Sequence, residues 1–159
     1  MASVPTRDQW FEWSGLRQLG FPNLAGGRRR IWSSPQFLVQ MNEMENWPLD
    51  RDRRAGPKQQ VEYALQHFSE AKHPLQPDWH FKEKRASACS IYYLRTRDVR
   101  VFGFLLGRGE FCAVFAEPKS SLRKQTDYEA PFQEVIHFIR ELKIPPPKCS
   151  KDAFDDIYR

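Results

Sequence analysis

The sequence lacks any apolar run long enough to cross a membrane. A spanning helix needs about 20 consecutive apolar residues, and no stretch of this 159-residue chain, of which 28% is charged, comes near that length. The N-terminal segment MASVPTRDQWFEW also has no apolar signal region after its arginine. We therefore expect neither membrane insertion nor secretion, and we expect a cytoplasmic location.

Cysteines are few. The chain has three, Cys89, Cys112 and Cys149, and none belongs to a CxxC pair. Cys89 and Cys112 fall in segments with a strand pattern, where cysteine behaves as a small hydrophobic residue. The odd number and the spacing indicate a reducing compartment and no structural disulfide.

Motifs of several catalytic classes are also missing. The four histidines, His67, His73, His80 and His137, do not have zinc-ligand spacing. No serine lies in a GxSxG elbow, no glycine-rich loop precedes a helix, and no paired carboxylates of a two-metal nuclease lie on strands. We expect no metal and no cofactor. His80, beside the basic letters KEKR, could transfer a proton or could pack within its loop.

Positive charge and aromatic side chains are abundant. The formal net charge is +5, hydrophobic residues make up 40% of the chain, and aromatic residues alone make up 14%. This is enough apolar material for the core of one ordinary domain. We place that domain at residues 29–145, with an N-terminal helical extension at 1–28 and a C-terminal tail at 146–159.

Hydrophobic periodicity predicts the order of the elements. Helical spacing occurs in RDQWFEWSGLRQLG, in PQFLVQMNEMENW, in PKQQVEYALQHFSEAKH, and after Asp127 toward Leu142. Strand patterns occur in RRIWSS, SACSIYYLRT, VRVFGFLLG and GEFCAVF, and we read HPLQPDWHFKEKRASA as a loop. The order predicts an α+β fold: a small antiparallel sheet, mainly a meander, with a helical hairpin on one face and a C-terminal helix.

Cationic side chains alternate with apolar ones in the predicted meander. One sheet face would then be apolar, and the other would display Arg95, Arg97, Arg100 and Lys119. Such a face suits a polyanion, of which nucleic acid is the commonest. The triplet Arg28-Arg29-Arg30 could be a solvated charge run or could contribute to that binding. The adjacent Tyr92 and Tyr93 would point to opposite faces, so at least one would be core and the other could stack on a base.

A ribonuclease that uses no metal needs two kinds of group. Cations must stabilise the phosphorane, which arginine and lysine do through charge-assisted hydrogen bonds. A lysine, tyrosine or carboxylate of suitable pKa must move the 2′-OH proton. The basic pattern supplies the first kind, and it is equally compatible with a scattered, solvated basic surface.

Three segments carry a family resemblance. They are FKEKR before the meander, YYLRTRDVRVFGFLL across its first two strands, and FAEPKSSLRKQTDYEAPFQEVIHFIREL leading into the last helix. Over residues 29–143 the chain resembles the RelE/HigB/ParE superfamily of toxins from type II toxin–antitoxin modules, especially its phage-derived branch.

The resemblance implies an endoribonuclease that cleaves mRNA without a metal, often in the ribosomal A site, and so inhibits translation. Its partners would be mRNA, the ribosome and a cognate antitoxin protein. It implies the catalytic residues Lys82, Lys84, Arg100, Lys119 and Tyr128. Arg100 and Lys119 would stabilise the phosphorane, the two other lysines would lie near the 2′-OH, and Tyr128 would orient the leaving group or stack on a base. RNA-binding residues would be Arg85, Arg95, Arg97, Arg123 and Lys124.

The chain also departs from that family. The first thirty residues are extra, the tail PPPKCSKDAFDDIYR is unusual, and the compact lysine pair after the last strand is spread over Lys119, Arg123 and Lys124. Two alternatives therefore stand: a non-catalytic interaction protein on the same fold, directed at gyrase or encoded by a phage as an inhibitor, and a plain nucleic-acid-binding module.

Overall fold

The computed structural model describes residues 3–20, 29–48, 55–70, 81–86, 89–107, 109–144 and 148–149. For residues 70 and 81–90 it describes no side chains. Three residues singled out in the sequence, Arg28, His73 and His80, lie outside the described residues, as does the tail apart from residues 148 and 149.

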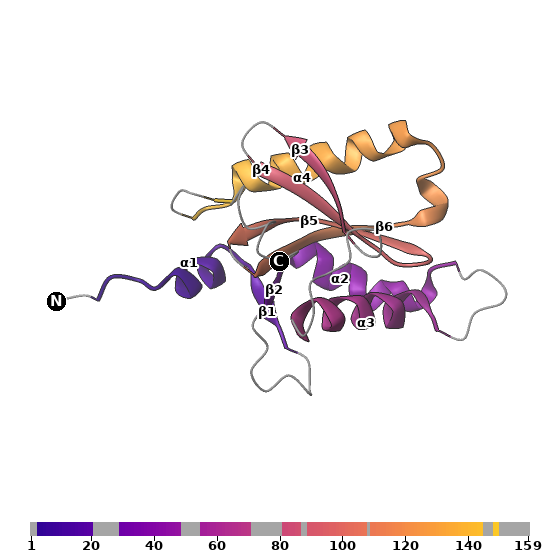
Figure 1. The fold of residues 1–159 in the computed structure, drawn as a ribbon. Coiled ribbons are helices and arrows are strands. Elements are labelled where there is room, and N and C mark those ends of the chain that lie inside the picture. Colours follow the sequence, from indigo (N-terminus) through magenta and orange to yellow (C-terminus); the bar gives the residue numbers. More distant parts are fainter. Residues whose placement is uncertain are drawn as a thin grey trace.

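The chain forms an α+β fold around a mixed, mostly antiparallel open sheet (Figure 1). The strands are β1 (Arg17–Leu19), β2 (Arg30–Ser33), β3 (Phe81–Ala86), β4 (Cys89–Arg95), β5 (Val99–Gly107) and β6 (Glu110–Pro118). The helices are α1 (Arg7–Trp13), α2 (Pro35–Glu43), α3 (Pro57–Glu70) and α4 (Glu129–Glu141), with short 3-10 turns η1 (Met44–Asn46), η2 (Lys119–Ser121) and η3 (Gln125–Tyr128). The spatial strand order is β1-β2-β6-β5-β4-β3, with β2 parallel to β6. The α+β class and the C-terminal helix are as predicted.

Local signals in the sequence explain where the helices begin. Thr6 and Gln9 form a capping box at the start of α1. The Ser34 hydroxyl accepts a hydrogen bond from the Phe37 amide at 3.0 Å, and Pro35 opens α2. Each cap satisfies an amide that the first helical turn leaves without a partner.

Apolar cores fill both faces of the sheet. On one face α2 and α3 contribute Phe37 and Phe68 to a core that includes Val101 and Phe111. On the other, α4 packs against the sheet (Figure 1), and its buried residues join a core that includes Phe102 and Phe115. Every residue of β5 except the last is buried, as are the first seven of β6.

The expectation of one apolar face and one open cationic face is therefore wrong. The letters VFGFLL and FCAVFA are nearly continuous apolar runs, and a strand covered on both sides reads in that way. Of the four cations expected on that face, only Arg97 and Lys119 are exposed, and both lie beyond the strands, in turns at one end of the sheet.

Two strands were not predicted. Strand β1 pairs antiparallel with β2, and the same N-terminal segment buries Phe11 and Leu16 in the core. Strand β3 falls within the segment read as a loop. Its letters FKEKRA carry four charges, which is typical of an edge strand and gives no hydrophobic alternation.

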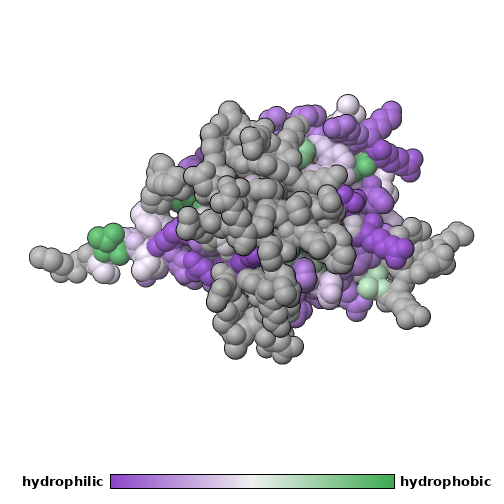
Figure 2. Space-filling view, in the orientation of Figure 1, coloured by the Kyte–Doolittle hydropathy of each residue, from purple (hydrophilic) through white to green (hydrophobic). Residues whose placement is uncertain are grey.

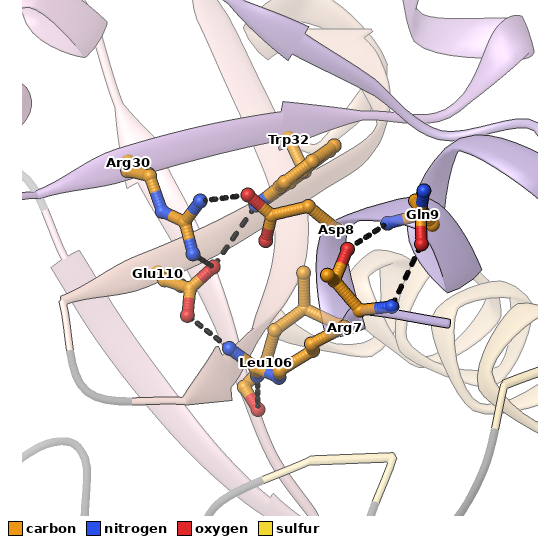
Figure 3. Close-up of polar contacts among 8 residues, drawn as sticks. Arg7, Asp8, Gln9, Arg30, Trp32, Leu106 and Glu110 are labelled. Carbon is orange, nitrogen blue, oxygen red and sulfur yellow. Dashed lines mark hydrogen bonds and ion pairs between the residues drawn. The ribbon is translucent and has the colours of Figure 1, made fainter. Parts of the chain in front are cut away.

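A charged cluster around Glu110 fixes α1 to the sheet (Figure 3). Glu110, only 7% exposed, pairs with Arg7 of α1 and with Arg30 at 2.9 Å, and accepts the Trp32 indole N–H at 3.0 Å. Arg7 also donates to the Leu106 carbonyl at 2.8 Å, and Arg30 pairs with Asp8 at 2.6 Å. One buried carboxylate thus contacts two arginines and an indole, and Asp8 supplies the second negative charge of the cluster.

Replacing Glu110 by glutamine is expected to lower the free energy of unfolding by about 2 kcal/mol, because breaking a buried pair leaves charge uncompensated. Glu45 gives a matched control, since its partner Lys58 is 3.2 Å away and its own side chain is 67% exposed. Glu45→Gln should cost less than about 0.5 kcal/mol. Equal losses in urea unfolding would contradict the structural role of Glu110.

The described surface is mostly hydrophilic. Figure 2 shows polar residues over most of the described part of this face, with apolar ones in small separate patches. Among the described residues, the exposed large hydrophobic ones are Val4, Trp13, Val39 and Tyr63. Among the described residues, no helix is both long and apolar enough to cross a bilayer.

Candidate nucleic-acid interface

Three segments that are distant in the sequence meet at one end of the sheet. They are the β4–β5 turn, the η2 turn after β6 and the η3 turn before α4. The Lys119 amide donates to the Asp98 carbonyl at 2.7 Å, which joins η2 to the β4–β5 turn. The Arg100 Nε donates to the Tyr128 hydroxyl at 3.3 Å, which joins β5 to η3. Three of the predicted catalytic residues, Arg100, Lys119 and Tyr128, therefore lie in one region.

Arg100 is buried, with 6% of its surface exposed. Its Nη1 donates to the carbonyls of Thr96 and Val99, in addition to the bond from Nε to Tyr128. The guanidinium thus closes the β4–β5 turn and holds Tyr128. This corrects the expectation that Arg100 is displayed on an open face.

Rows of side chains cross the strands beneath α4. Arg95, Arg100 and Glu117 occupy opposite positions on β4, β5 and β6, and Tyr93, Phe102 and Phe115 form the next row. The Phe102 and Phe115 rings stack at 5.2 Å. The first row, at the end of the sheet, is charged, and the second row is aromatic. In these two rows the charged side chains therefore lie only at the end of the sheet.

The two adjacent tyrosines have different environments. Tyr92 is fully buried and belongs to the core under α2 and α3. Tyr93 is half-buried on the α4 face, with its ring centroid 5.1 Å from that of Tyr128 and 5.7 Å from that of Phe102. Burial raises the pKa of the Tyr93 hydroxyl and nearby Tyr128 raises it further, whereas Arg100 and Arg95 oppose the shift. Tyr92 is therefore a core residue, and the ring of Tyr93 packs against the ring of Tyr128.

Four exposed cations surround this end of the sheet. They are Arg97, Lys119, Arg123 and Lys124, which we call the basic rim. The Arg123 Nε donates to the Ser120 carbonyl at 3.3 Å, and the Lys124 amide donates to the Asp127 carboxylate at 2.8 Å. These bonds fix the loop, while the Lys124 ammonium and the Nη atoms of Arg123 remain available to phosphate groups.

Glu117 was not singled out in the sequence. It is half-buried, and burial raises the pKa of its carboxyl group, with nearby Glu134 raising it further. A carboxyl group whose pKa is shifted toward neutrality is suited to proton transfer. The only sequence signal was its place two residues before Lys119, because Glu134, which influences its carboxyl group, lies on α4 and is distant in the sequence.

The remaining predicted residues lie on β3. The backbones of Lys82, Lys84 and Arg85 pair with Tyr93, Ile91 and Ser90 of β4. Their side chains lie outside the described part of the chain. The register therefore puts the Lys82 backbone beside the aromatic row.

The described arginines of the Arg28–Arg30 triplet make internal contacts. The Arg29 Nη1 donates to the Phe68 carbonyl at 3.3 Å, and its guanidinium lies 5.5 Å from the centre of the Phe68 ring. Arg30 belongs to the Glu110 cluster. Neither arginine is simply a solvated charge.

The state of the cysteines differs from the prediction that the chain has no structural disulfide. Cys112 is a fully buried free thiol, and burial raises its pKa. Cys149 is disulfide-bonded, so the expectation of no structural disulfide is wrong. Cys149 packs against the core under α4, a contact that no periodic pattern after the last helix could indicate. The cysteines therefore give no support to a reducing compartment.

Comparison with protein families, with curated proteins and with solved structures found no match for this chain.

Proposed function

We propose that the chain is a metal-independent endoribonuclease of the RelE/HigB/ParE toxin type that cleaves mRNA, free or in the ribosome, and inhibits translation in the cytoplasm. A cognate antitoxin protein would neutralise it. One observation carries the proposal: hydrogen bonds join three distant segments so that Arg100 and Tyr128 lie near Lys119 of the basic rim.

The order of the elements agrees with this proposal. The resemblance implies a helical hairpin followed by a strand meander and a final helix. The chain has α2 and α3, then β4, β5 and β6, then α4. This agreement supports a RelE-like fold, although β1, β3 and the covering of the second sheet face are additional.

The chemistry would begin with binding of RNA phosphates to the basic rim. The 2′-oxygen would attack the adjacent phosphorus and lose its proton to the Glu117 carboxylate. Lys119 would stabilise the negative charge of the phosphorane. The bond from phosphorus to the 5′-oxygen would then break, and that oxygen would take a proton from water. Arg100 would act through Tyr128, whose hydroxyl it holds in place.

A second candidate is a non-catalytic RNA-binding or inhibitor protein on the same fold. The burial of Arg100 favours it, because a guanidinium that already bonds two backbone carbonyls and Tyr128 has less capacity left for a reacting phosphate. This candidate retains salt-dependent RNA binding and leaves RNA intact.

Single substitutions Lys119→Ala, Arg123→Ala and Lys124→Ala test the rim. If each cation contacts one phosphate, each variant should reduce the slope of log K against log salt by about 0.7 for single-stranded RNA. Arg17→Ala on the edge strand β1 is a matched control, since Arg17 is exposed and lies outside the rim. Unchanged slopes for all three rim variants would exclude the rim as the RNA-binding surface.

A further inference from the structure

A cavity lies at the end of α4 that is far from Tyr128. It is open, has a volume of about 600 Å³, and lies where α1 approaches the end of α4; its lining residues are Trp10, Arg140, Glu141, Leu142, Lys143, Ile144 and Lys148. The thirteen residues of α4 separate it from Tyr128 by about 20 Å, at 1.5 Å per residue. The cavity is therefore distinct from the basic rim.

Trp10 forms an aromatic wall that the rest of the fold holds in place. The Glu110 cluster anchors α1 through Arg7 and Asp8, as Figure 3 shows. The neighbouring Phe11 packs edge-on against Trp32 at 5.0 Å. Trp13 packs edge-on against Trp10 itself at 5.5 Å. Because α1 is anchored and Trp10 itself packs against the core under α4, the indole can receive a flat ring with little reordering.

The other lining residues combine an apolar floor with positive charge. Leu142 and Ile144 are buried, with 4% and 8% of their surfaces exposed. Arg140 and Lys143 are exposed, and neither has an ion-pair partner within the described part of the chain.

Lys148 is held at the same cavity. Its Nζ donates to the Arg140 carbonyl at 3.1 Å, which places a third cation at the C-terminal end of α4. Among the described lining residues Glu141 is the single acidic one, so cations outnumber carboxylates three to one there. The net charge of the described lining is positive.

We propose that this cavity binds a nucleoside monophosphate unit, with its base against the Trp10 indole and its phosphate between Lys143 and Arg140. An aromatic wall above an apolar floor suits the face of a base. Cations without acidic partners suit a phosphate. A base alone would contact only the aromatic and apolar residues of the lining. Inorganic phosphate alone would contact only its cations. The unit would be a free nucleotide or the end of an oligonucleotide.

The test is a titration of the full chain with UMP, AMP, uridine, adenosine and a 5′-phosphorylated tetranucleotide, followed by the indole N–H signals in NMR spectra. Nucleotides should bind at least tenfold more tightly than the matching nucleosides. Equal affinity for nucleoside and nucleotide, or no binding of any ligand at millimolar concentration, would overturn the proposal. Preference for the tetranucleotide would identify an RNA end as the source of the unit, and preference for UMP or AMP would identify a free nucleotide.

Two variants assign the binding to this cavity. Trp10→Ala should weaken nucleotide binding about tenfold, as loss of one stacking partner does. Lys143→Glu should abolish the preference for nucleotide over nucleoside, and since Lys143 is exposed its replacement should leave folding intact. Lys58→Glu on α3, which is outside the cavity, should leave nucleotide affinity unchanged. Normal nucleotide affinity in Lys143→Glu would overturn the assignment, whatever the effect of Trp10→Ala.

Discussion

Replacing Gly103 by alanine is expected to destabilise the fold by about 3 kcal/mol, the upper range for overpacking a tight core. A Cβ at this position would lie 2.0 Å from the Cys112 carbonyl oxygen and 2.6 Å from the Phe111 ring. Gly103 lies at a register shift between β5 and β6, both of which are central strands. The Cys112 carbonyl belongs to the backbone of β6 and cannot move aside without disturbing the sheet.

Gly20 provides the matched control. A Cβ there would meet nothing within 4 Å, so Gly20→Ala should change stability by less than about 1 kcal/mol. The free energy of unfolding of both variants can be measured by urea denaturation with circular dichroism. A Gly103→Ala protein as stable as Gly20→Ala would show that β5 and β6 do not approach as closely as the structure indicates.

The double variant Arg100→Ala, Lys119→Ala is expected to lose at least about 100-fold in RNA cleavage, because removal of one group that stabilises transition-state charge, here Lys119, usually costs that much. The two residues would contribute differently. Lys119 is exposed and would meet the phosphate directly, whereas Arg100 is buried and would act by holding Tyr128 and the β4–β5 turn.

Single variants separate these two contributions. Arg100→Lys keeps the charge but cannot reproduce the three bonds of the planar guanidinium, so it should lose both cleavage and stability. Lys119→Ala should lose cleavage with little change in stability. Cleavage by the double variant at the wild-type rate would contradict the assignment of this end of the sheet.

Several elements follow directly from sequence patterns. Val61, Leu65 and Phe68 recur at helical spacing, and all three are buried on α3. Pro35 after Ser34 marks the start of α2, as the cap at Ser34 shows. In these cases the local sequence signal favours the same element as the tertiary packing does. The sequence alone was therefore sufficient to predict these helices.

Other features depend on contacts that the sequence does not reveal. The letters of β3 are too polar for strand alternation, and that strand forms only by pairing with β4. Arg100 reads as an exposed strand residue, yet its surroundings come from Thr96, Val99 and Tyr128. Glu117 likewise is influenced by Glu134, which lies on α4. Predicting these features required knowledge of which distant segments meet in the fold.

Cleavage of a defined mRNA by the purified chain in EDTA tests the proposed function most directly. We expect discrete cleavage sites, with cyclic 2′,3′-phosphate ends upstream and 5′-hydroxyl ends downstream, because the 2′-oxygen is the proposed nucleophile. The Lys119→Ala variant should give far fewer ends at the same protein concentration. RNA that stays intact both free and in translating ribosomes, or cleavage that EDTA abolishes, would contradict a metal-independent endoribonuclease.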